Sequence, residues 1–447
     1  MLSIAVENRI NQLNPWLTYP ERAKDFLDRF LPPEYVHRDA EKTSLRPDRA
    51  LLVVGPRQSG KSTMIWHLLR RFIPDILFLN MEDLLIRTEC VYPLDFVELV
   101  RNKYGFIKVI FIDEIQHMEE AGLFVKGIVD AKMNLPILVT GSSSFHLRSK
   151  TRESLAGRAS RRLLMPFGME EILSHLNPPN PVSERKMTEE IFSHQVIFGS
   201  YPSIYLAPGH DEKRMLLNDL VEALILRDAS DLYKIKRIDA LRKLLALLAG
   251  QIGNLVNLSE LASICNVDVG TVNAYMELLD ESHIIKKITP FAGGKRREIT
   301  SSPKVFFVDN GIRNQLINNF SNELDLRTDK GQLLENWVFS EIFKVLPLQS
   351  SLKFWRSKAK AEVDFIVEHT GKIYPIEVKY SSLKTPRLSR SAWSFIEAYK
   401  PENFAVLNIT LEKSITSKNT RIDFITPHSL SRWIRNILGT KTPIFYS

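Results

Sequence analysis

Cysteine is scarce in this chain of 447 residues, and long apolar runs are missing from it. Its two cysteines, Cys90 and Cys265, stand far apart and near no histidine-rich spacing, which indicates neither a disulfide framework nor a zinc site. No stretch approaches the roughly 18 consecutive apolar residues of a membrane-spanning helix. Glu7 and Arg9 also interrupt the first residues before the apolar part of a secretion signal can develop. We therefore expect a cytoplasmic protein without a membrane partner.

Low-complexity tracts, internal repeats and a strong charge imbalance are also missing. The chain has 60 Lys and Arg against 52 Asp and Glu, a net charge of +8, with 44% apolar and 25% charged residues. These are globular proportions, which exclude a disordered acidic chain and a collagen-like repeat. The mild positive charge is compatible with a polyanionic partner such as DNA but does not require one. At roughly 150 residues per domain, the length allows about three domains.

Between residues 50 and 167, short apolar runs alternate with amphipathic stretches. The runs are LLVVG, DILFLN, KVIFID, PILVTG and RRLLMPF. Buried parallel strands separated by crossover helices have this pattern. The pattern predicts a doubly wound α/β sheet over residues 1–168, an N-terminal extension included, with its ligand beyond the carboxyl ends of the strands.

The rest of the chain divides into three parts. Residues 169–236 read as a helical lid interrupted by a Pro-rich segment, and residues 237–311 as three helices followed by two strands around a basic turn. The latter order predicts a winged helix-turn-helix. Residues 312–447 open with an amphipathic helix and continue as strands, which predicts a separate α/β domain.

A phosphate-binding loop follows the first apolar run. Its residues are Gly55, Pro56, Arg57, Gln58, Ser59, Gly60, Lys61 and Ser62. They lie between a predicted strand and a predicted helix, where such a loop turns backbone N–H groups toward phosphates. Lys61 would reach the β- and γ-phosphate oxygens and Ser62 would ligate Mg²⁺, with Thr63 as the weaker candidate. ATP and Mg²⁺ are therefore the predicted cofactors.

Two carboxylates end the third apolar run. Asp113 would hold Mg²⁺ through water, and Glu114 would polarise the attacking water as general base. A solvated acidic strand end is the alternative. The next run leads into Ser142, whose hydroxyl would lie between neighbouring strand ends and sense the γ-phosphate or the water.

Arg158 follows a predicted short helix. A guanidinium there could project into a neighbouring subunit and neutralise charge on the γ-phosphate. A surface salt bridge is the alternative reading, and Arg161 and Arg162 compete for the same role.

Four of these segments resemble a known family. They are Gly55-Pro56-Arg57 with Gly60-Lys61-Ser62, Ile112-Asp113-Glu114-Ile115-Gln116, Ser154-Leu155-Ala156-Gly157-Arg158 and Gly199-Ser200-Tyr201-Pro202. The chain looks like the prokaryotic AAA-type P-loop ATPases that carry a poorly characterised C-terminal domain. The resemblance implies a homo-oligomer, with a hexameric ring as one form, and an approach of Gly199 and Pro202 to the nucleotide.

The predicted third helix of the winged region would carry the DNA-reading side chains. Thr271 and Asn273 would face base edges, and the basic turn would place Lys295, Arg296 and Arg297 on phosphates. The helix is poor in Arg, Lys and Gln, so strong sequence specificity is not expected. A winged domain that only packs against its neighbour is the alternative.

The last domain carries an acidic constellation. Strand periodicity puts Glu377 and Lys379 on one face, a hairpin would bring Asp364 beside them, and Glu335 would add a carboxylate from the opening helix. Asp364 and Glu377 would hold Mg²⁺ at a scissile phosphate, and Lys379 would support the attacking water or the developing charge.

This set resembles the PD-(D/E)xK nuclease superfamily, which includes restriction endonucleases and Holliday-junction resolvases. The proline expected before the aspartate is absent, and Val363 takes its place. The resemblance implies a restriction-endonuclease-like fold and, as an open alternative, an inactive nucleic-acid-binding or structural domain.

Together these readings predict an ATP-hydrolysing DNA-binding motor or remodeller coupled to a Mg²⁺-dependent nuclease-like domain. Its substrates would be DNA ends, single strands or branched DNA. The alternative is an ATP-driven switch that binds a protein partner and carries an inactive nuclease-like domain.

Overall fold

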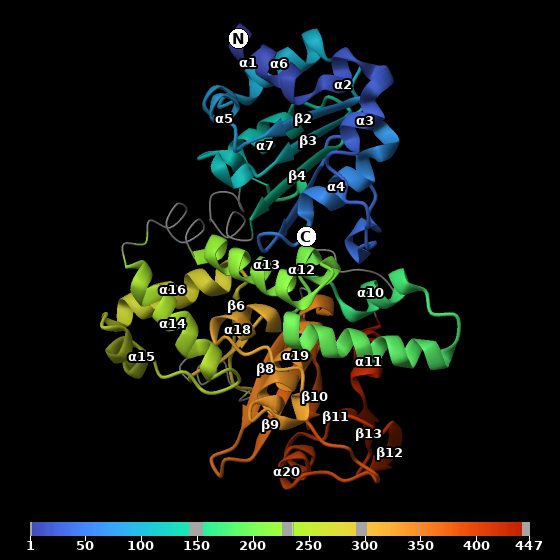
Figure 1. Ribbon diagram of the computed structural model, residues 1–447, viewed down its shortest axis with the longest axis vertical. Coiled ribbons are helices and arrows are strands. Elements are labelled where there is room, and N and C mark those ends of the chain that lie inside the picture. The colour runs from blue at the N-terminus through green and yellow to red at the C-terminus, as the bar shows by residue number, and fades with distance from the viewer. Residues whose placement is uncertain are drawn as a thin grey trace. The chain divides into compact units, whose positions relative to one another are not determined.

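The computed structural model describes residues 2–142, 155–225, 235, 237–291, 302–347 and 349–439, with Ser142 described by its backbone only. Its contacts separate two compact units, one reaching Met165 and one beginning at Pro166. We call them the first and the second unit and describe each by itself (Figure 1).

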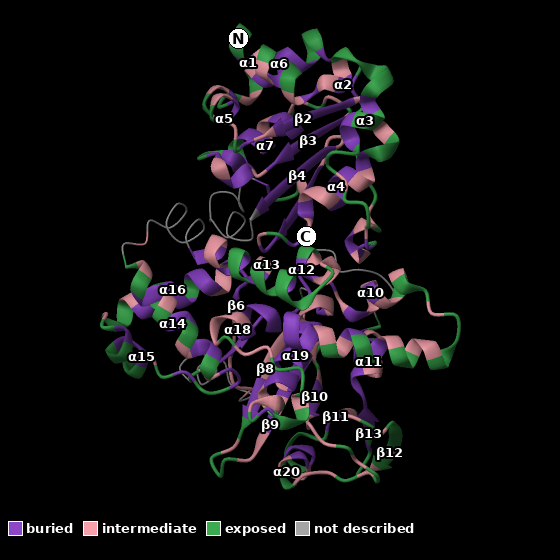
Figure 2. Cartoon of the chain, in the orientation of Figure 1, coloured by how far each residue is buried: buried purple, intermediate pink, exposed green. Residues whose placement is uncertain are grey.

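The first unit is built on a five-stranded sheet in which every adjacent pair is parallel. Across the sheet the strands are β2 (Ile76–Asn80), β3 (Val109–Asp113), β4 (Ile137–Ser142), β1 (Ala50–Gly55) and β5 (Ala159–Leu163). Residues of β1, β2 and β3 are almost all buried, as Figure 2 shows, because helices cover both faces. The predicted doubly wound parallel sheet is therefore confirmed.

Alternate residues of β1 enter two separate cores. Leu52 and Val54 pack with α6 (Pro93–Lys103) and α7 (Ala121–Asp130), whereas Leu51 and Val53 pack with α4 (Lys61–Leu69). The helices of this unit are α1 (Ile4–Leu13), α2 (Pro15–Thr18), α3 (Ala23–Leu27), α4 (Lys61–Leu69), α5 (Leu84–Glu89), α6 (Pro93–Lys103) and α7 (Ala121–Asp130). Single 3₁₀ turns span Pro20–Arg22, Asp39–Glu41, Arg70–Phe72 and Ile115–His117.

The N-terminal segment covers the free edge of β2. The Asn14 side chain accepts a hydrogen bond of 2.6 Å from the Phe78 N–H and donates one of 2.8 Å to the Phe78 carbonyl. The Trp16 indole N–H donates to the Ile76 carbonyl at 2.8 Å. Two side chains thus satisfy backbone groups that a neighbouring strand would otherwise pair.

The second unit begins with a helical region. Its helices are α10 (Met169–Leu176), α11 (Pro181–Phe198), α12 (Pro202–Leu206), α13 (His210–Ala223), α14 (Ile238–Gly250), α15 (Leu258–Cys265), α16 (Val269–Glu281) and α18 (Asn310–Leu316). Two antiparallel strands, β6 (Ile285–Ile288) and β7 (Lys304–Phe307), follow α16. A single hydrophobic core runs from Ile197 to Ile312 and so joins the predicted lid to the predicted winged region.

A six-stranded mixed sheet completes the second unit. Across the sheet its strands are β12 (Lys413–Ser417), β13 (Thr420–Ile425), β11 (Asn403–Leu407), β10 (Lys372–Val378), β9 (Glu362–His369) and β8 (Ser351–Arg356). The remaining elements are the 3₁₀ turn Leu324–Leu326 and the helices α19 (Lys330–Val345), α20 (Arg390–Tyr399) and α21 (Pro427–Leu438). Phe395 of α20 shares a core with Ile366 of β9, and Phe339 of α19 packs near Phe365, so α19 and α20 cover opposite faces.

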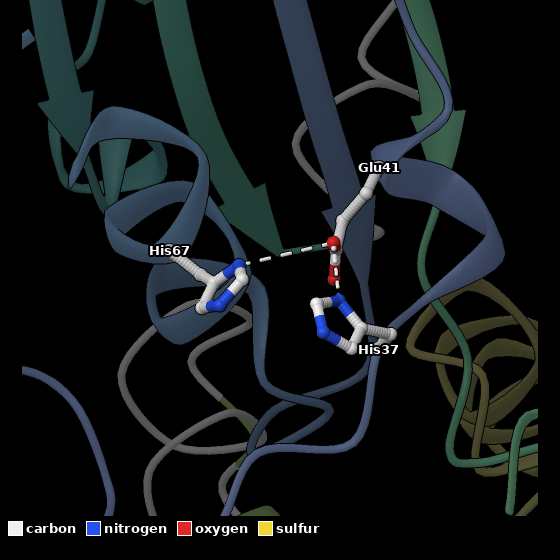
Figure 3. Close-up of side chains that lie close together, drawn as sticks. All are labelled: His37, Glu41 and His67. Atoms are coloured by element: carbon white, nitrogen blue, oxygen red, sulfur yellow. Dashed lines mark hydrogen bonds and ion pairs between the residues drawn. The ribbon is translucent and has the colours of Figure 1, made fainter. Parts of the chain in front are cut away.

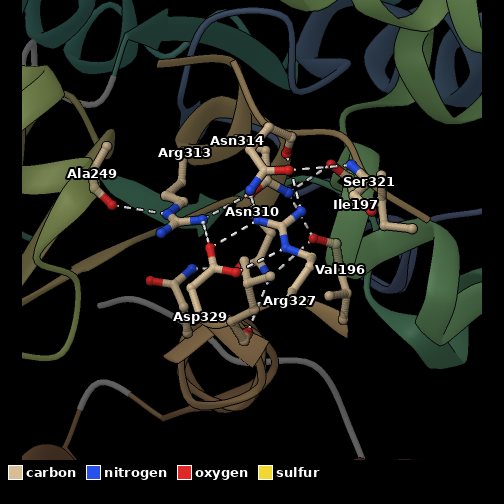
Figure 4. A network of polar contacts seen from close by, with 12 residues as sticks. Val196, Ile197, Ala249, Asn310, Arg313, Asn314, Ser321, Arg327 and Asp329 are labelled. Atoms are coloured by element: carbon tan, nitrogen blue, oxygen red, sulfur yellow. Dashed lines mark hydrogen bonds and ion pairs between the residues drawn. The ribbon is translucent and has the colours of Figure 1, made fainter. Parts of the chain in front are cut away.

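A buried polar network ties the helices of the second unit together (Figure 4). Arg327 donates two hydrogen bonds to the Asp329 carboxylate, at 2.9 and 2.8 Å, and Arg313 donates a third at 2.5 Å. Arg313 also donates to the Ala249 carbonyl at the end of α14, and Asn314 to the carbonyls of Val196 and Ile197 in α11. The network fixes α11, α14 and α18 around the start of α19.

Within the described part of the chain, no helix is both long enough and apolar enough to span a bilayer. Both cysteines are free and buried.

Candidate functional site

The loop between β1 and α4 has the backbone of a phosphate-binding loop. Gly60 has φ +89° and Gln58 has φ +60°, left-handed conformations that turn the chain sharply before α4 begins at Lys61. A Cβ at Gly55 would overlap the Leu164 carbonyl after β5, so close backbone approach requires glycine there. The predicted strand, loop and helix therefore follow one another as the motif demands.

Two cationic side chains, Lys61 and Arg38, donate hydrogen bonds to backbone carbonyls of this loop. The Lys61 ammonium donates to the carbonyls of Gly55 and Pro56, at 3.3 and 2.9 Å. Arg38, which is 5% exposed, donates to the Ser59 carbonyl at 3.0 Å and to the Met165 carbonyl at 2.6 Å. Sequence reasoning missed Arg38, because no motif links a residue before β1 to the loop after it.

Asp113 lies at the carboxyl end of β3, directly across from the start of α4. The Ser62 hydroxyl donates to Asp113 Oδ1 at 2.8 Å, and the buried Thr140 hydroxyl of β4 donates to the same oxygen. The Thr140 hydroxyl also accepts the Glu114 backbone N–H at 3.0 Å. Thr140 is a second residue that sequence reasoning missed; its only signal is a hydroxyl inside an otherwise apolar strand.

The electrostatics at Asp113 favour a bound cation. Burial, followed by the nearby Glu114 charge, raises the pKa of Asp113 to about 6, against opposing hydrogen bonds from Thr140 and Ser62. A bound cation would offset both the burial and the Glu114 charge that oppose ionisation of Asp113. The hydroxyl of Ser62 and the carboxylate of Asp113 are also the oxygen donors that Mg²⁺ prefers. The residues present therefore fit Mg²⁺.

Glu114 has φ +54°, which turns its backbone out of the strand. Its carboxylate accepts a hydrogen bond from the Gln116 amide, a contact between neighbours that restricts its position. Thr140 therefore contacts both the Asp113 carboxylate and the Glu114 backbone, whereas the Glu114 carboxylate is held by Gln116.

A cavity of about 360 Å³ lies beside Ser62 and Asp113. Ser62, Thr63 and Asp113 line its polar part, and aromatic side chains that include Trp16 and Trp66 line the rest. Thr63 and Ser62, the two candidate metal ligands, therefore both line this cavity.

Two other residues were predicted to contact the nucleotide, Ser142 and Arg158. The backbone of Ser142 pairs with Gly55, so β4 ends between β1 and β3 as expected, while the side chain of Ser142 lies outside the described residues. Arg158 donates a 2.7 Å hydrogen bond to Asp130 of its own chain. This is the surface ion pair foreseen as its alternative; a role across a subunit interface stays a prediction.

Gly199 and Pro202 lie in the second unit. Gly199 has φ +79°, and a Cβ there would overlap the Asp309 carboxylate. The N–H of Ser200 donates to that carboxylate at 2.7 Å, and Pro202 begins α12. Packing against Asp309 accounts for the glycine, and the approach of this turn to the nucleotide stays a prediction.

The four residues of the acidic constellation meet in the second unit. Asp364 of β9 accepts the Val378 N–H of β10 at 2.7 Å, and the Lys379 ammonium lies 3.4 Å from Glu377 Oε2. Burial and then the Glu335 charge raise the pKa of Asp364 well above its ordinary value, with Glu377 adding to the effect. The hairpin predicted from sequence therefore brings these side chains into one electrostatic cluster.

Lys304 of β7 enters the same cluster, which sequence reasoning did not foresee. Its ammonium lies 3.3 Å from Glu335 Oε1 and 2.5 Å from Glu362 Oε1, and its side chain is 4% exposed. Burial lowers the pKa of Lys304, but the charges of Glu335 and Glu362 outweigh burial and raise it. One lysine thus already balances part of the acidic charge.

The remaining acidic charge fits a divalent cation. Glu377 Oε2 is buried and makes no hydrogen bond, although Lys379 lies near it. A buried carboxylate oxygen without a donor is costly, and a cation would satisfy it. The Asp364 and Glu377 oxygens therefore suit Mg²⁺, while the Lys304 ammonium occupies the Glu335 side of the cluster.

The predicted DNA-reading residues are only partly described. Thr271 is occupied in capping α16, because its backbone N–H and its hydroxyl both donate to Asp268, at 2.8 and 2.6 Å. Asn273 is exposed on α16. Lys295, Arg296 and Arg297 lie outside the described residues.

Comparison with known protein families assigns the first unit. Residues 47–173 match the family described as AAA domain. These residues form a P-loop AAA domain. Residues 189–323 match a domain of unknown function, DUF8612, and residues 330–427 match another, DUF4143. The DUF8612 match extends across the single core that joins α11 to α18.

Similar proteins occur in archaea and bacteria. An uncharacterized protein of Methanocaldococcus jannaschii is 23% identical over 82% of this chain and 82% of its own length. An uncharacterized protein of Haemophilus influenzae is 26% identical over 74% of this chain and 82% of its own.

Solved structures give weaker matches. Cdc6p from Pyrobaculum aerophilum is 12% identical, with a TM-score of 0.27, over 65% of this chain and 98% of that chain. AMPPCP-bound DnaA from Aquifex aeolicus is 14% identical, with a TM-score of 0.25, over 60% and 88%. TM-scores this low do not establish a shared fold, so the AAA assignment rests on the family match and on the parallel sheet.

Proposed function

We propose that the chain binds and hydrolyses ATP at its P-loop and couples hydrolysis to the action of its second unit on DNA. The observation that carries the ATP part is the 2.8 Å hydrogen bond from Ser62 to Asp113, with Glu114 as the next residue. This contact supports the proposal, because it brings the Ser62 hydroxyl beside the carboxylate expected to hold a nucleotide-bound Mg²⁺ through water, with the candidate base as the next residue.

Each side chain has a separate task in this proposal. The Lys61 ammonium would leave the loop carbonyls for the β- and γ-phosphates, and loop N–H groups would donate hydrogen bonds to the phosphate oxygens. Glu114 would orient the attacking water and take its proton as general base while the bond from the γ-phosphorus to the leaving ADP oxygen breaks. Thr140 holds Asp113 in place. Ser62 and, through water, Asp113 would hold Mg²⁺, which would supply positive charge to the phosphates.

We also infer a homo-oligomer, in which Arg158 of one subunit reaches the nucleotide of the next. Arg158 is partly exposed and its 2.7 Å contact with Asp130 lies at the surface, so the side chain is able to exchange that contact for a phosphate. A ring is the closed form of such a head-to-tail arrangement.

The second unit supports two activities on DNA. Binding to phosphates is favoured by the net charge of +8 of the whole chain, and phosphodiester hydrolysis by the second unit is favoured by the grouping of Asp364, Glu377 and Lys379. In hydrolysis, water would attack phosphorus while the bond to the leaving oxygen breaks, and Lys379 would stabilise the developing negative charge. Hydrolysis is the second candidate function, because Lys304 already occupies one side of the cluster.

Single-turnover and steady-state assays test the ATP part. Lys61→Ala should abolish ATP binding measured by calorimetry, whereas Glu114→Gln should bind ATP and lose at least about 100-fold in hydrolysis. Thr88→Val, an exposed change on α5, serves as the matched control. An unchanged hydrolysis rate in Lys61→Ala would remove the proposal.

A salt titration and a cleavage assay test the DNA part. DNA should stimulate ATP hydrolysis, and DNA affinity should fall steeply with added salt. Linear, single-stranded and four-way-junction DNA are incubated with Mg²⁺, and Asp364→Ala and Glu377→Ala should stop cleavage while ATP turnover persists. No DNA response at all would favour an ATP-driven switch that binds a protein partner, with an inactive acidic cluster.

A further inference from the structure

Two histidines and a glutamate meet beside the P-loop helix, away from the residues assigned to ATP. His37 precedes the 3₁₀ turn that contains Glu41, and His67 lies on α4 (Figure 3). His37 Nδ1 is 3.1 Å and His67 Nδ1 is 3.8 Å from the same oxygen, Glu41 Oε2. One atom from each of the three side chains lies within 4.8 Å of the other two. Two imidazoles and a carboxylate thus converge on one point.

The other oxygen of Glu41 is already held by donors. The Tyr35 hydroxyl and the Arg38 backbone N–H, the latter at 2.8 Å, both donate to Glu41 Oε1. The Tyr35 ring also stacks on the His67 imidazole, with centroids 4.1 Å apart and planes at 15°. Metal-binding carboxylates and histidines are commonly oriented by such neighbouring groups. These contacts leave Oε2 facing both rings.

We propose that His37, Glu41 and His67 bind one divalent transition-metal ion, with Zn²⁺ as the best match. Zinc bonds of about 2.0–2.1 Å in a tetrahedron separate ligand atoms by roughly 3.3 Å. The present separations of 3.1 and 3.8 Å need only small side-chain shifts to reach that spacing. Imidazole with carboxylate suits zinc and its neighbours better than Mg²⁺. Water would complete the coordination shell of the ion, because the His37 side chain is 72% exposed and the site is open to solvent.

The ion would tie residues 37–41 to α4 and so to the P-loop. Arg38, in the middle of that segment, donates to the Ser59 carbonyl inside the loop. Fixing the segment on both sides of Arg38 restricts the positions open to its guanidinium. Metal binding should therefore raise ATP affinity, and by linkage ATP should raise metal affinity by the same factor. This coupling, unlike the metal site itself, rests on the proposed binding of ATP.

The full-length chain, freed of metal with a chelator, is titrated with ZnCl₂ by calorimetry, and bound zinc is counted after gel filtration by mass spectrometry. We expect His37→Ala to weaken zinc binding at least about 10-fold and His37→Ala/His67→Ala to bind one ion fewer than the parent chain. Co²⁺ should give a visible absorption spectrum in the parent chain that the double variant lacks. His37→Ala is the primary variant, because its exposed side chain is not needed for folding.

His117→Ala is the matched control. His117 belongs with Glu82 and Glu114 to another group of candidate ligands among the described residues, so zinc bound there would be lost in this variant and retained in His37→Ala. Unchanged zinc affinity and stoichiometry in the double variant, or no zinc binding by the parent, would overturn the proposal. Zinc bound as proposed without any effect on ATP affinity would reject the coupling alone. Failure of ATP to bind at all would count against the proposed function and leave the zinc result standing.

Discussion

The ammonium of Lys304 and the carboxylate of Glu335 lie 3.3 Å apart inside the second unit, with 4% and 16% of the two side chains exposed. Lys304 comes from the two-stranded β6–β7 sheet and Glu335 from α19, which covers the six-stranded sheet. The pair therefore joins the predicted winged region to the acidic cluster. It also places a positive charge of the protein where a nuclease-like site would gather cations.

Replacing Lys304 with an uncharged residue should destabilise the second unit. Lys304→Met keeps most of the side-chain volume but leaves Glu335 and Glu362 without their buried counter-charge. Breaking a buried pair in this way costs about 3–5 kcal/mol in the free energy of unfolding. Denaturant unfolding monitored with and without Mg²⁺ measures the loss.

Added Mg²⁺ should stabilise Lys304→Met more than the parent, since a divalent cation can replace the lost charge. Lys372→Met provides the control, because Lys372 of β10 pairs with the exposed Glu402 at the surface of the six-stranded sheet and should change stability little. Equal Mg²⁺ responses in variant and parent would argue that the ion does not replace the charge of Lys304 beside Glu335 and Glu362.

Acid should weaken the buried network of the second unit through Asp329. Burial opposes ionisation of Asp329, but hydrogen bonds from Arg327 and Arg313 outweigh burial and lower its pKa from 3.8 to about 2. The stability gained from this carboxylate is present above about pH 4 and is lost as the pH falls toward 2, because the unfolded chain binds the proton first.

Asp329→Asn isolates this contribution from the other carboxylates. The difference in unfolding free energy between parent and Asp329→Asn should be largest near neutral pH and should shrink below about pH 4. Urea unfolding across this pH range measures it. A difference that stays constant with pH would mean that Asp329 is not the titrating group.

Sequence patterns predicted the parallel sheet and the P-loop of the first unit, because these features depend on residues that are close together in the chain. A strand, a loop with glycines at fixed positions and a helix follow one another within a few residues, so Gly55, Gly60 and Lys61 could be placed without knowledge of the fold. The hairpin that carries Asp364 and Glu377 is local in the same sense. Each of these features depends on chain geometry over short distances.

The contacts that sequence reasoning missed all join distant segments. Arg38 reaches Ser59, Asn14 reaches Phe78, and Lys304 reaches Glu335, and none of these pairs has a characteristic spacing. Gly199 is a further case, since the structure gives it a packing contact with Asp309 that its motif did not indicate, while its approach to the nucleotide stays a prediction. A motif identifies a residue type at a position, but only the tertiary fold decides its neighbours.

Asn14 should be essential for the free edge of β2. Asn14→Leu keeps the volume but leaves the Phe78 N–H and carbonyl without partners in a buried position. Each unsatisfied backbone group costs about 1–3 kcal/mol, so the first unit should lose roughly 2–5 kcal/mol. Hydrogen exchange should show the Phe78 amide losing protection, whereas Gln12→Ala, an exposed change on α1, should leave it protected.

Thr140 should separate ATP binding from hydrolysis. Thr140→Val preserves the shape of the β4 residue but removes the hydroxyl that donates to Asp113 and accepts the Glu114 N–H. Asp113 then becomes still harder to ionise, and the Asp113 carboxylate and the Glu114 backbone N–H both lose their hydrogen bond to Thr140, so kcat for ATP hydrolysis should fall about 10- to 100-fold while the Kd for ATP changes little. Thr140→Ser restores a hydroxyl and should recover most of the rate, which a purely structural role of the Thr140 methyl group would not produce. Hydrolysis at the parent rate in Thr140→Val would show that Asp113 is positioned by Ser62 and the strand alone.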